Sequence, residues 1–271
     1  MRDYIPLMEY EATIRIGVFI GLFVVLAFAE AVRPRRILTQ MRARRWLTNW
    51  VLSFLNTGTL QIVAMVLPLL AVGAALDASA LGWGLFNILD WPLWAEILLA
   101  VLIFDLAIWA QHLITHKIPL LWRFHRMHHA DRDIDVTTAI RFHPVEIAFS
   151  MIVKVGLVYI IGPSAVAILI FEILLNGTAM FNHSNLKLPL GLDRVVRLVL
   201  VTPDMHRVHH SDQRIEHDSN YGFALSIWDR IFGTYVAQPS KGHEKMTIGL
   251  RWQDDRPNRL VWSLLLPFRR K

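Results

Sequence analysis

Residues 121–133, LWRFHRMHHADRD, and residues 202–212, TPDMHRVHHSD, share the pattern His-Arg-X-His-His. Positions three and four apart lie on one face of a helix, so each stretch predicts a helix that directs two or three imidazoles toward one point. Imidazole is a common ligand of iron, zinc, copper and nickel. The histidines that predict a metal site in this way are His125, His128, His129, His206, His209 and His210.

A third histidine pair joins this set. His112 and His116, in residues 105–119 (DLAIWAQHLITHKIP), are four positions apart. Eight histidines exceed the roughly four to six ligands that saturate one transition-metal ion, so two ions share them more naturally. Iron would allow redox chemistry, whereas zinc would not. The zinc-protease pattern His-Glu-X-X-His is missing, because Leu113 follows His112. Histidines that bind no metal are the alternative interpretation.

The composition indicates a membrane protein. Hydrophobic residues make up 54% of the 271 residues and charged residues only 18%, where a soluble domain has about a quarter. The net charge is +6, but the basic residues flank apolar runs, which favours contact with anionic lipid headgroups over nucleic acid binding. The absence of cysteine excludes disulfides, thiolate metal sites and a cysteine nucleophile.

Apolar runs divide the chain into membrane segments and a cap. The fourth run contains Gly162-Pro163, which predicts two shorter helices in a re-entrant hairpin. We predict an all-α integral membrane protein, one domain over residues 1–271, with about four transmembrane or re-entrant segments. Residues 184–271 are expected to form a cytosolic helical cap that holds a His-rich di-metal site. The apolar runs are residues 16–31, 46–76, 91–114 and 147–180.

The distribution of arginine predicts the orientation in the membrane. Six arginines lie in the linker of residues 33–45, which the positive-inside rule places in the cytoplasm. The N-terminus, which has no recognisable cleavable signal peptide, is then outside, and the histidines face the cytoplasm. Residues 192–201, LDRVVRLVLV, are expected to lie along the membrane interface.

The order of the three histidine motifs on a four-helix membrane scaffold resembles the fatty acid hydroxylase/sterol desaturase superfamily, over residues 100–236. The resemblance implies a non-haem di-iron centre, O2 as co-substrate, and hydroxylation or desaturation of a lipid C–H bond. It also implies zinc as a possible substitute in a purified protein. His183, in FNHSN, matches a further ligand of the family. The implied ligands are thus His112, His116, His125, His128, His129, His183, His206, His209 and His210.

Several residues near the motifs are candidates for supporting roles. Asp105 lies two turns before His112 and is expected to accept a hydrogen bond from a ligand imidazole, or to pair with an arginine. His143, in RFHPVE, is interpreted as an extra ligand, a proton donor or a helix cap. Asp131 is expected to bond to a ligand imidazole or to cap a helix. His217 is a less favoured ligand.

The segment around Asn220, Tyr221 and Gly222 is expected to form a turn within the cap, and His243 is expected at the surface. The lipid substrate would enter from the bilayer. Electrons would come from a separate ferredoxin or cytochrome with its reductase, since the chain has no recognisable haem-binding segment. The compact length favours a bacterial cytoplasmic membrane. Alternative functions are redox-silent lipid hydrolysis by a di-metal site and metal transport across the membrane.

Overall fold

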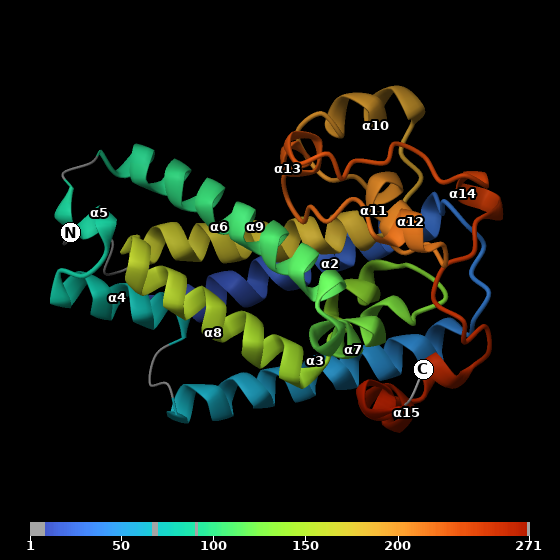
Figure 1. The fold of residues 1–271 in the computed structure, drawn as a ribbon, viewed down its shortest axis with the longest axis horizontal. Helices are drawn as coiled ribbons and strands as arrows, with labels where there is room; N and C mark the ends of the chain where they lie inside the picture. The colour runs from blue at the N-terminus through green and yellow to red at the C-terminus, as the bar shows by residue number, and fades with distance from the viewer. Residues whose placement is uncertain (1–8, 67–69, 90–91, 270–271) are drawn as a thin grey trace.

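The computed structural model describes residues 9–66, 70–89 and 92–269, which form an all-α protein and so confirm the predicted fold class. The long helices lie side by side in a bundle, and short helices gather at one of its ends (Figure 1). Within the described ranges, pairing between extended segments is limited to isolated bridges. The helices of the bundle are α2 (Glu11–Val32), α3 (Arg42–Val66), α4 (Ala71–Leu81), α5 (Leu85–Ile88), α6 (Leu93–Lys117), α8 (Pro144–Ile161) and α9 (Ala165–His183).

Among the described residues, five segments are long and apolar enough to cross a membrane, namely α2, residues 71–88, α6, α8 and α9. The second apolar run was expected as one segment, but α3 ends at Val66 and α4 begins at Ala71. The sequence places Pro68 between them, and proline is unfavourable inside a helix. Residues 67–69, the start of the third run at Trp91 and the N-terminal residues 1–8 lie outside the described residues.

The predicted break at Gly162-Pro163 is confirmed. Gly162 ends α8 in the left-handed region with φ 68°, and the Ser164 side chain caps the start of α9. A Cβ on Gly84 would lie 2.3 Å from the Gly162 nitrogen, so α5 docks on this turn only because both residues are glycine. Two helices, α8 with 18 residues and α9 with 19, thus replace one long helix, and each is long enough to cross a membrane.

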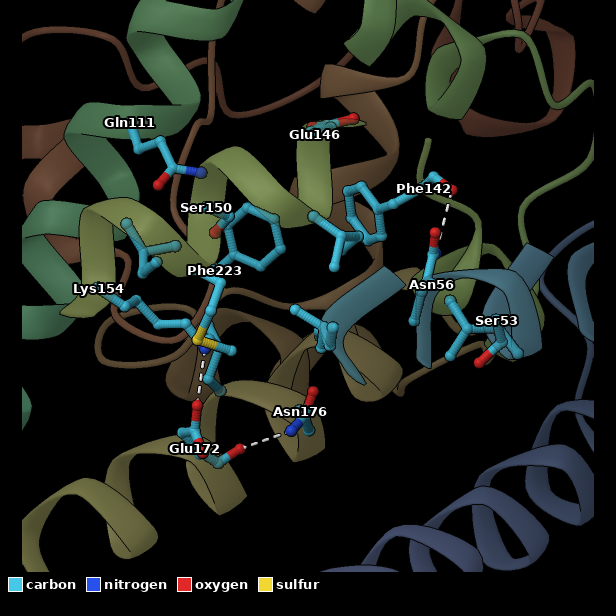
Figure 2. Close-up of a pocket in the computed structure, with 18 of the residues that line it drawn as sticks. Ser53, Asn56, Gln111, Phe142, Glu146, Ser150, Lys154, Glu172, Asn176 and Phe223 are labelled. Carbon is cyan, nitrogen blue, oxygen red and sulfur yellow. Dashed lines mark hydrogen bonds and ion pairs between the residues drawn. The ribbon is translucent and has the colours of Figure 1, made fainter. Parts of the chain in front are cut away.

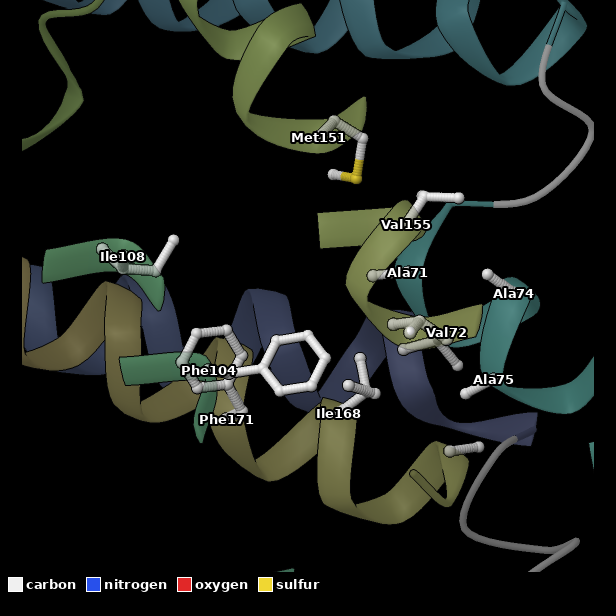
Figure 3. Close-up of a cluster of buried hydrophobic side chains, with 12 residues drawn as sticks. Ala71, Val72, Ala74, Ala75, Phe104, Ile108, Met151, Val155, Ile168 and Phe171 are labelled. Atoms are coloured by element: carbon white, nitrogen blue, oxygen red, sulfur yellow. The ribbon is translucent and has the colours of Figure 1, made fainter. Parts of the chain in front are cut away.

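The largest apolar cluster lies where α4 packs against α6, α8 and α9 (Figure 3). Phe104 of α6 and Phe171 of α9 pack with ring centroids 5.2 Å apart. The small side chains of α4 let this helix lie close to α8 and α9, and Ala74 and Ala75 are fully buried there. Close packing of this kind fixes the positions of α6 and α9, whose far ends carry histidines.

The cap and the Arg-rich linker lie together at the histidine end of the bundle (Figure 1). Arg35 of the linker forms an ion pair with Asp204, and Arg36 donates to the carbonyl oxygens of His243 and Met246. The linker and both histidine motifs are therefore at one end of the bundle. The short helices here are α7 (Pro119–His129), α10 (Leu190–Val196), α11 (Pro203–His209), α12 (Arg214–His217), α13 (Ile227–Ile231), α14 (Gly242–Lys245) and α15 (Leu260–Leu265).

Candidate metal centre

Four helices bring the nine predicted histidines together in two buried groups. In each group, every residue offers a ligand atom within 4.8 Å of the others. His112 and His116 come from the end of α6, His183 from the end of α9, and the rest from α7 and α11, except for His210, which follows α11. The larger group is His112, His116, His125, His129 and His209, and the smaller group is His128, His183, His206 and His210.

Residues at the N-termini of α7 and α11, which carry the two His-Arg-X-His-His motifs, favour the start of a helix. Pro119 occupies the first turn of α7, where its missing N–H costs nothing. The Thr202 side chain caps α11 by accepting from the Met205 amide, and Pro203 follows it. Both helices pack between the bundle and the cap, and their histidines are buried there.

Five of these histidines use Nδ1 in a hydrogen bond to a protein oxygen. Four of the partners are backbone carbonyls, which only accept, so the imidazole must carry its proton on Nδ1. Its Nε2 then presents a lone pair, which is the form that binds a metal. The pairs are His112 with Tyr221 O (2.8 Å), His128 with Arg141 O (3.1 Å), His183 with Ala179 O (2.8 Å), His209 with Ser219 O (2.6 Å) and His125 with Glu146 Oε1 (2.6 Å).

These hydrogen bonds leave lone pairs facing one another. The Nε2 atoms of His112 and His125 are 3.0 Å apart, and those of His128 and His183 are 3.1 Å apart. Two lone pairs at this distance repel unless a positive charge lies beside them. Both histidine groups contain Nε2–Nε2 contacts of this length, so the donor set fits a cation in each group.

Protonation of His128 does not supply that charge in the smaller group. Burial, and then the neighbouring imidazoles, hold the pKa of His128 well below its usual value. The same causes, in the same order, lower the pKa of His129, His206 and His210. These four imidazoles are therefore neutral at pH 7, as metal ligands must be. Neither ring nitrogen of His116 or His210 has a hydrogen-bond partner within the described part of the chain.

Asp105 is buried, but its carboxylate accepts hydrogen bonds from the cap rather than from an imidazole. The donors are the amides of Ala224 and Leu225, at 3.3 and 3.1 Å, and the Trp228 indole, at 2.8 Å. The expected contact with a ligand is therefore wrong. The segment after the second histidine motif folds back onto α6, where its free amides reach Asp105 first. This residue fastens the cap to the bundle.

Asp131 follows the α7 histidines and pairs with Arg45 of α3 instead of an imidazole. Two 2.9 Å hydrogen bonds join them, and both side chains are buried. Burial alone would raise the pKa of Asp131, but the Arg45 guanidinium holds it below its usual value. Arg45 also bonds to Asp135, at 2.6 Å. The loop after α7 is thus tied to α3.

The other three histidines lie outside both groups. His143 caps α8, accepting from the Val145 amide at 3.1 Å, which fits the interpretation as a helix cap. His217 stacks on Trp122 with ring centroids 5.5 Å apart. His243 was expected at the surface, but it is only 5% exposed and lies 3.6 Å from Asp204. The surface expectation is wrong because the C-terminal segment folds over α11.

Sequence reasoning missed Glu146, which orients His125. Its only signal is its place in the first turn of α8, three residues after His143. It also missed the carbonyls of Tyr221 and Ser219, since any residue type supplies a carbonyl. A turn was expected at residues 220–222, but the structure has no turn there; Asn220 adopts φ 51°, and its side chain packs the cap by donating to Met205 O and Val236 O.

A cavity of about 290 Å³ inside the bundle reaches the larger histidine group. His112 and His125 line one end, beside Gln111 and Phe223. Figure 2 shows Gln111 and Glu146 at one end of the cavity and Glu172 and Asn176 at the other. The cavity is thus an internal path from the middle of the bundle to the histidines.

Comparison with known proteins gives a consistent set of matches. A model of the fatty acid hydroxylase family matches residues 97–234, just over half of the chain. Ornithine lipid hydroxylase OlsE of Rhizobium tropici is 27% identical over 225 residues, which are 82% of this chain and 67% of that protein. Alkylglycerol monooxygenase of Homo sapiens is 35% identical over 170 residues, 61% of this chain and 35% of that protein.

Cholesterol 25-hydroxylase of Rattus norvegicus is 26% identical over 147 residues, which are 54% of this chain and 48% of that protein. The chain thus spans about a third of the alkylglycerol monooxygenase and about half of the cholesterol hydroxylase that it matches. No solved structure matches the fold.

Proposed function

The chain belongs to the fatty acid hydroxylase family, and we propose on that premise that it is a membrane-bound oxidoreductase that hydroxylates a C–H bond of a lipid. The relatives named above are hydroxylases or monooxygenases of lipids, which favours hydroxylation over desaturation. The observation that carries the proposal is the pair of lone-pair contacts, His112 with His125 and His128 with His183. Each contact needs a cation, so the site is built for two metal ions.

The nine histidines of the two groups are the proposed ligands, and iron is the proposed metal. Iron bound there would supply the redox chemistry that lets O2 hydroxylate an unactivated C–H bond. The carbonyls of Tyr221 and Arg141 fix the tautomers of His112 and His128, so the ligand atoms need no rearrangement to bind. Burial of both groups keeps bulk water from the reacting atoms.

The cavity positions the substrate. Its wall next to His112 is formed by Ile108, Met151 and Phe223, which suit a hydrocarbon chain. Glu146 orients His125 through its Oε1 atom. A lipid that enters from the bilayer would therefore present one of its carbons to the larger histidine group.

The remaining parts of the proposal follow from charge and family. Electrons come from a separate ferredoxin or cytochrome donor with its reductase, and the isolated protein should not turn over with NAD(P)H alone. The Arg-rich linker favours a cytoplasmic site with the N-terminus outside. The bacterial relative favours the bacterial cytoplasmic membrane.

The test combines metal analysis with product analysis. The purified protein should contain about two iron ions per chain, and it should insert one atom of ¹⁸O2 into a lipid when a reductant system is present. His128→Ala and His209→Ala each remove a ligand from a different group, so each should lower the iron content and abolish the product. His217→Ala, outside both groups, is the matched control. Full activity of the double variant H128A/H209A would refute the proposal.

A further inference from the structure

Three charged side chains meet at the end of the cavity that lies away from the histidines. Lys154 Nζ of α8 is 2.7 Å from Glu172 Oε1 of α9, and Arg15 Nη1 of α2 is 3.0 Å from Glu172 Oε2. All three residues line the cavity. Figure 2 shows the Lys154–Glu172 pair far from Gln111 and Glu146.

Placing these three charges inside the bundle is energetically unfavourable. Glu172 precedes His183 by eleven residues in α9, so it lies about 16 Å along the helix from the histidine end. The segments that carry Arg15, Lys154 and Glu172 are all candidate membrane spans. Ionised groups at membrane depth are expensive and are kept where they serve a function.

The cluster has more hydrogen-bond donors than acceptors. Both oxygens of Glu172 are already occupied by cations. Lys154 has three N–H donors and Arg15 has five, more than Glu172 can accept. Glu11 takes a further donor of Arg15 at 2.7 Å, but it does not line the cavity. The cavity wall at this end therefore presents two cations and one anion.

The histidine end of the cavity has the opposite character. Gln111 Oε1 and Glu146 Oε2 are buried acceptors without a hydrogen-bond partner in the described ranges. The two ends thus recognise different groups. A molecule that fits both has an acceptor or an anion at the Lys154 end and its reacting carbon near His112 and His125.

We propose that Lys154 and Arg15 form a subsite for the oxyanion of an amphiphilic substrate, a carboxylate or a phosphate. The anion would take the spare N–H donors of both cations, and the chain beyond it would follow the cavity to the histidines. The lining residues Thr57 and Asn176 are exposed on the outside of the bundle, so a lipid can enter sideways between α3 and α9. The reaction of the bound substrate rests on the proposed function, whereas the binding of its oxyanion does not.

The experiment measures binding in metal-free protein, so it does not depend on turnover. The probes are hexadecanoate, hexadecyl phosphate and methyl hexadecanoate, titrated into chelator-treated protein in neutral detergent. At least one anion should bind roughly tenfold more tightly than the ester, the gain typical of one charge-assisted hydrogen bond. Whichever anion binds more tightly identifies the source of the oxyanion.

Two variants test the residues. Lys154→Met and Arg15→Gln should each reduce the preference for the anion to about threefold or less, while Lys187→Met, on the exposed surface, should leave it unchanged. Equal binding of all three probes to the native protein would overturn the inference, and this comparison needs no variant to fold. A preference that survives both Lys154→Met and Arg15→Gln would also overturn it. Failure of hydroxylation with intact anion selectivity would instead count against the proposed function alone.

Discussion

Replacing Arg45 by methionine should strongly destabilise the protein. Arg45 is fully buried and bonds to the carboxylates of Asp131 and Asp135 at 2.9 and 2.6 Å. Methionine has a similar length but no charge, so two buried carboxylates lose their partner. Breaking a buried ion pair costs about 3–5 kcal/mol. Since 1 kcal/mol shifts Tm by about 2–4 °C in a chain of this size, we expect Tm to fall by roughly 6–20 °C.

Arg44 provides a matched control one residue away. Its side chain is 56% exposed and lies 3.3 Å from Asp255, which is also exposed. Surface ion pairs contribute about 0–1 kcal/mol, so Arg44→Met should shift Tm by less than about 4 °C. The assay is thermal unfolding in detergent, followed by intrinsic fluorescence, with iron content measured on the same samples. Equal shifts in both variants would refute the reasoning, because the burial of Arg45 would then have no energetic consequence.

Three further predictions concern other parts of the molecule. Glu146→Gln should weaken iron binding about 10–100-fold in a chelator titration, since it loosens the orientation of His125. Burial lowers the pKa of His243 to about 4, whereas the unfolded chain has a His pKa of about 6.5. The unfolded state therefore binds a proton first as pH drops, so stability should fall between about pH 6.5 and 4. His243→Gln should flatten this fall in Tm. Because the chain has no cysteine, a spin label can be attached at a single new cysteine. At Leu192→Cys, an exposed apolar position expected at the membrane interface, the label should be accessible to lipid-soluble O2. At the exposed Arg214→Cys it should be accessible to an aqueous nickel reagent.

The histidine motifs could be predicted from the sequence because their geometry is local. Spacings of three and four residues place imidazoles on one helix face whatever the rest of the chain does. The expectation that the motifs share two metal ions came from counting their histidines. The division into two groups did not follow, because it depends on how α7 packs against α11. His128 and His129 are neighbours in sequence but belong to different groups.

The supporting residues could not be predicted because their partners are distant in sequence. Arg45 and Asp131 are 86 positions apart, and the sequence gives each many possible partners. The arginines of the linker were interpreted as a topological signal, and Arg45 in addition turns out to be a buried structural residue. Asp105 was correctly identified as unusual for its depth, but its donors lie about 120 positions later in the chain. Residue type indicates that a buried charge needs a partner, but not which one.

The backbone carbonyls around the histidines explain why the site needs the whole fold. Arg141 lies before α8, whereas Ser219 and Tyr221 lie between α12 and α13, and each fixes one imidazole through its carbonyl. With Nδ1 held in this way, the ring cannot turn its proton toward the neighbouring lone pair. The repulsion between facing Nε2 atoms is therefore built into the folded protein and is relieved only by a cation. A metal ion bound there and the packing of the cap would stabilise each other, because loss of either frees the imidazoles that the other holds.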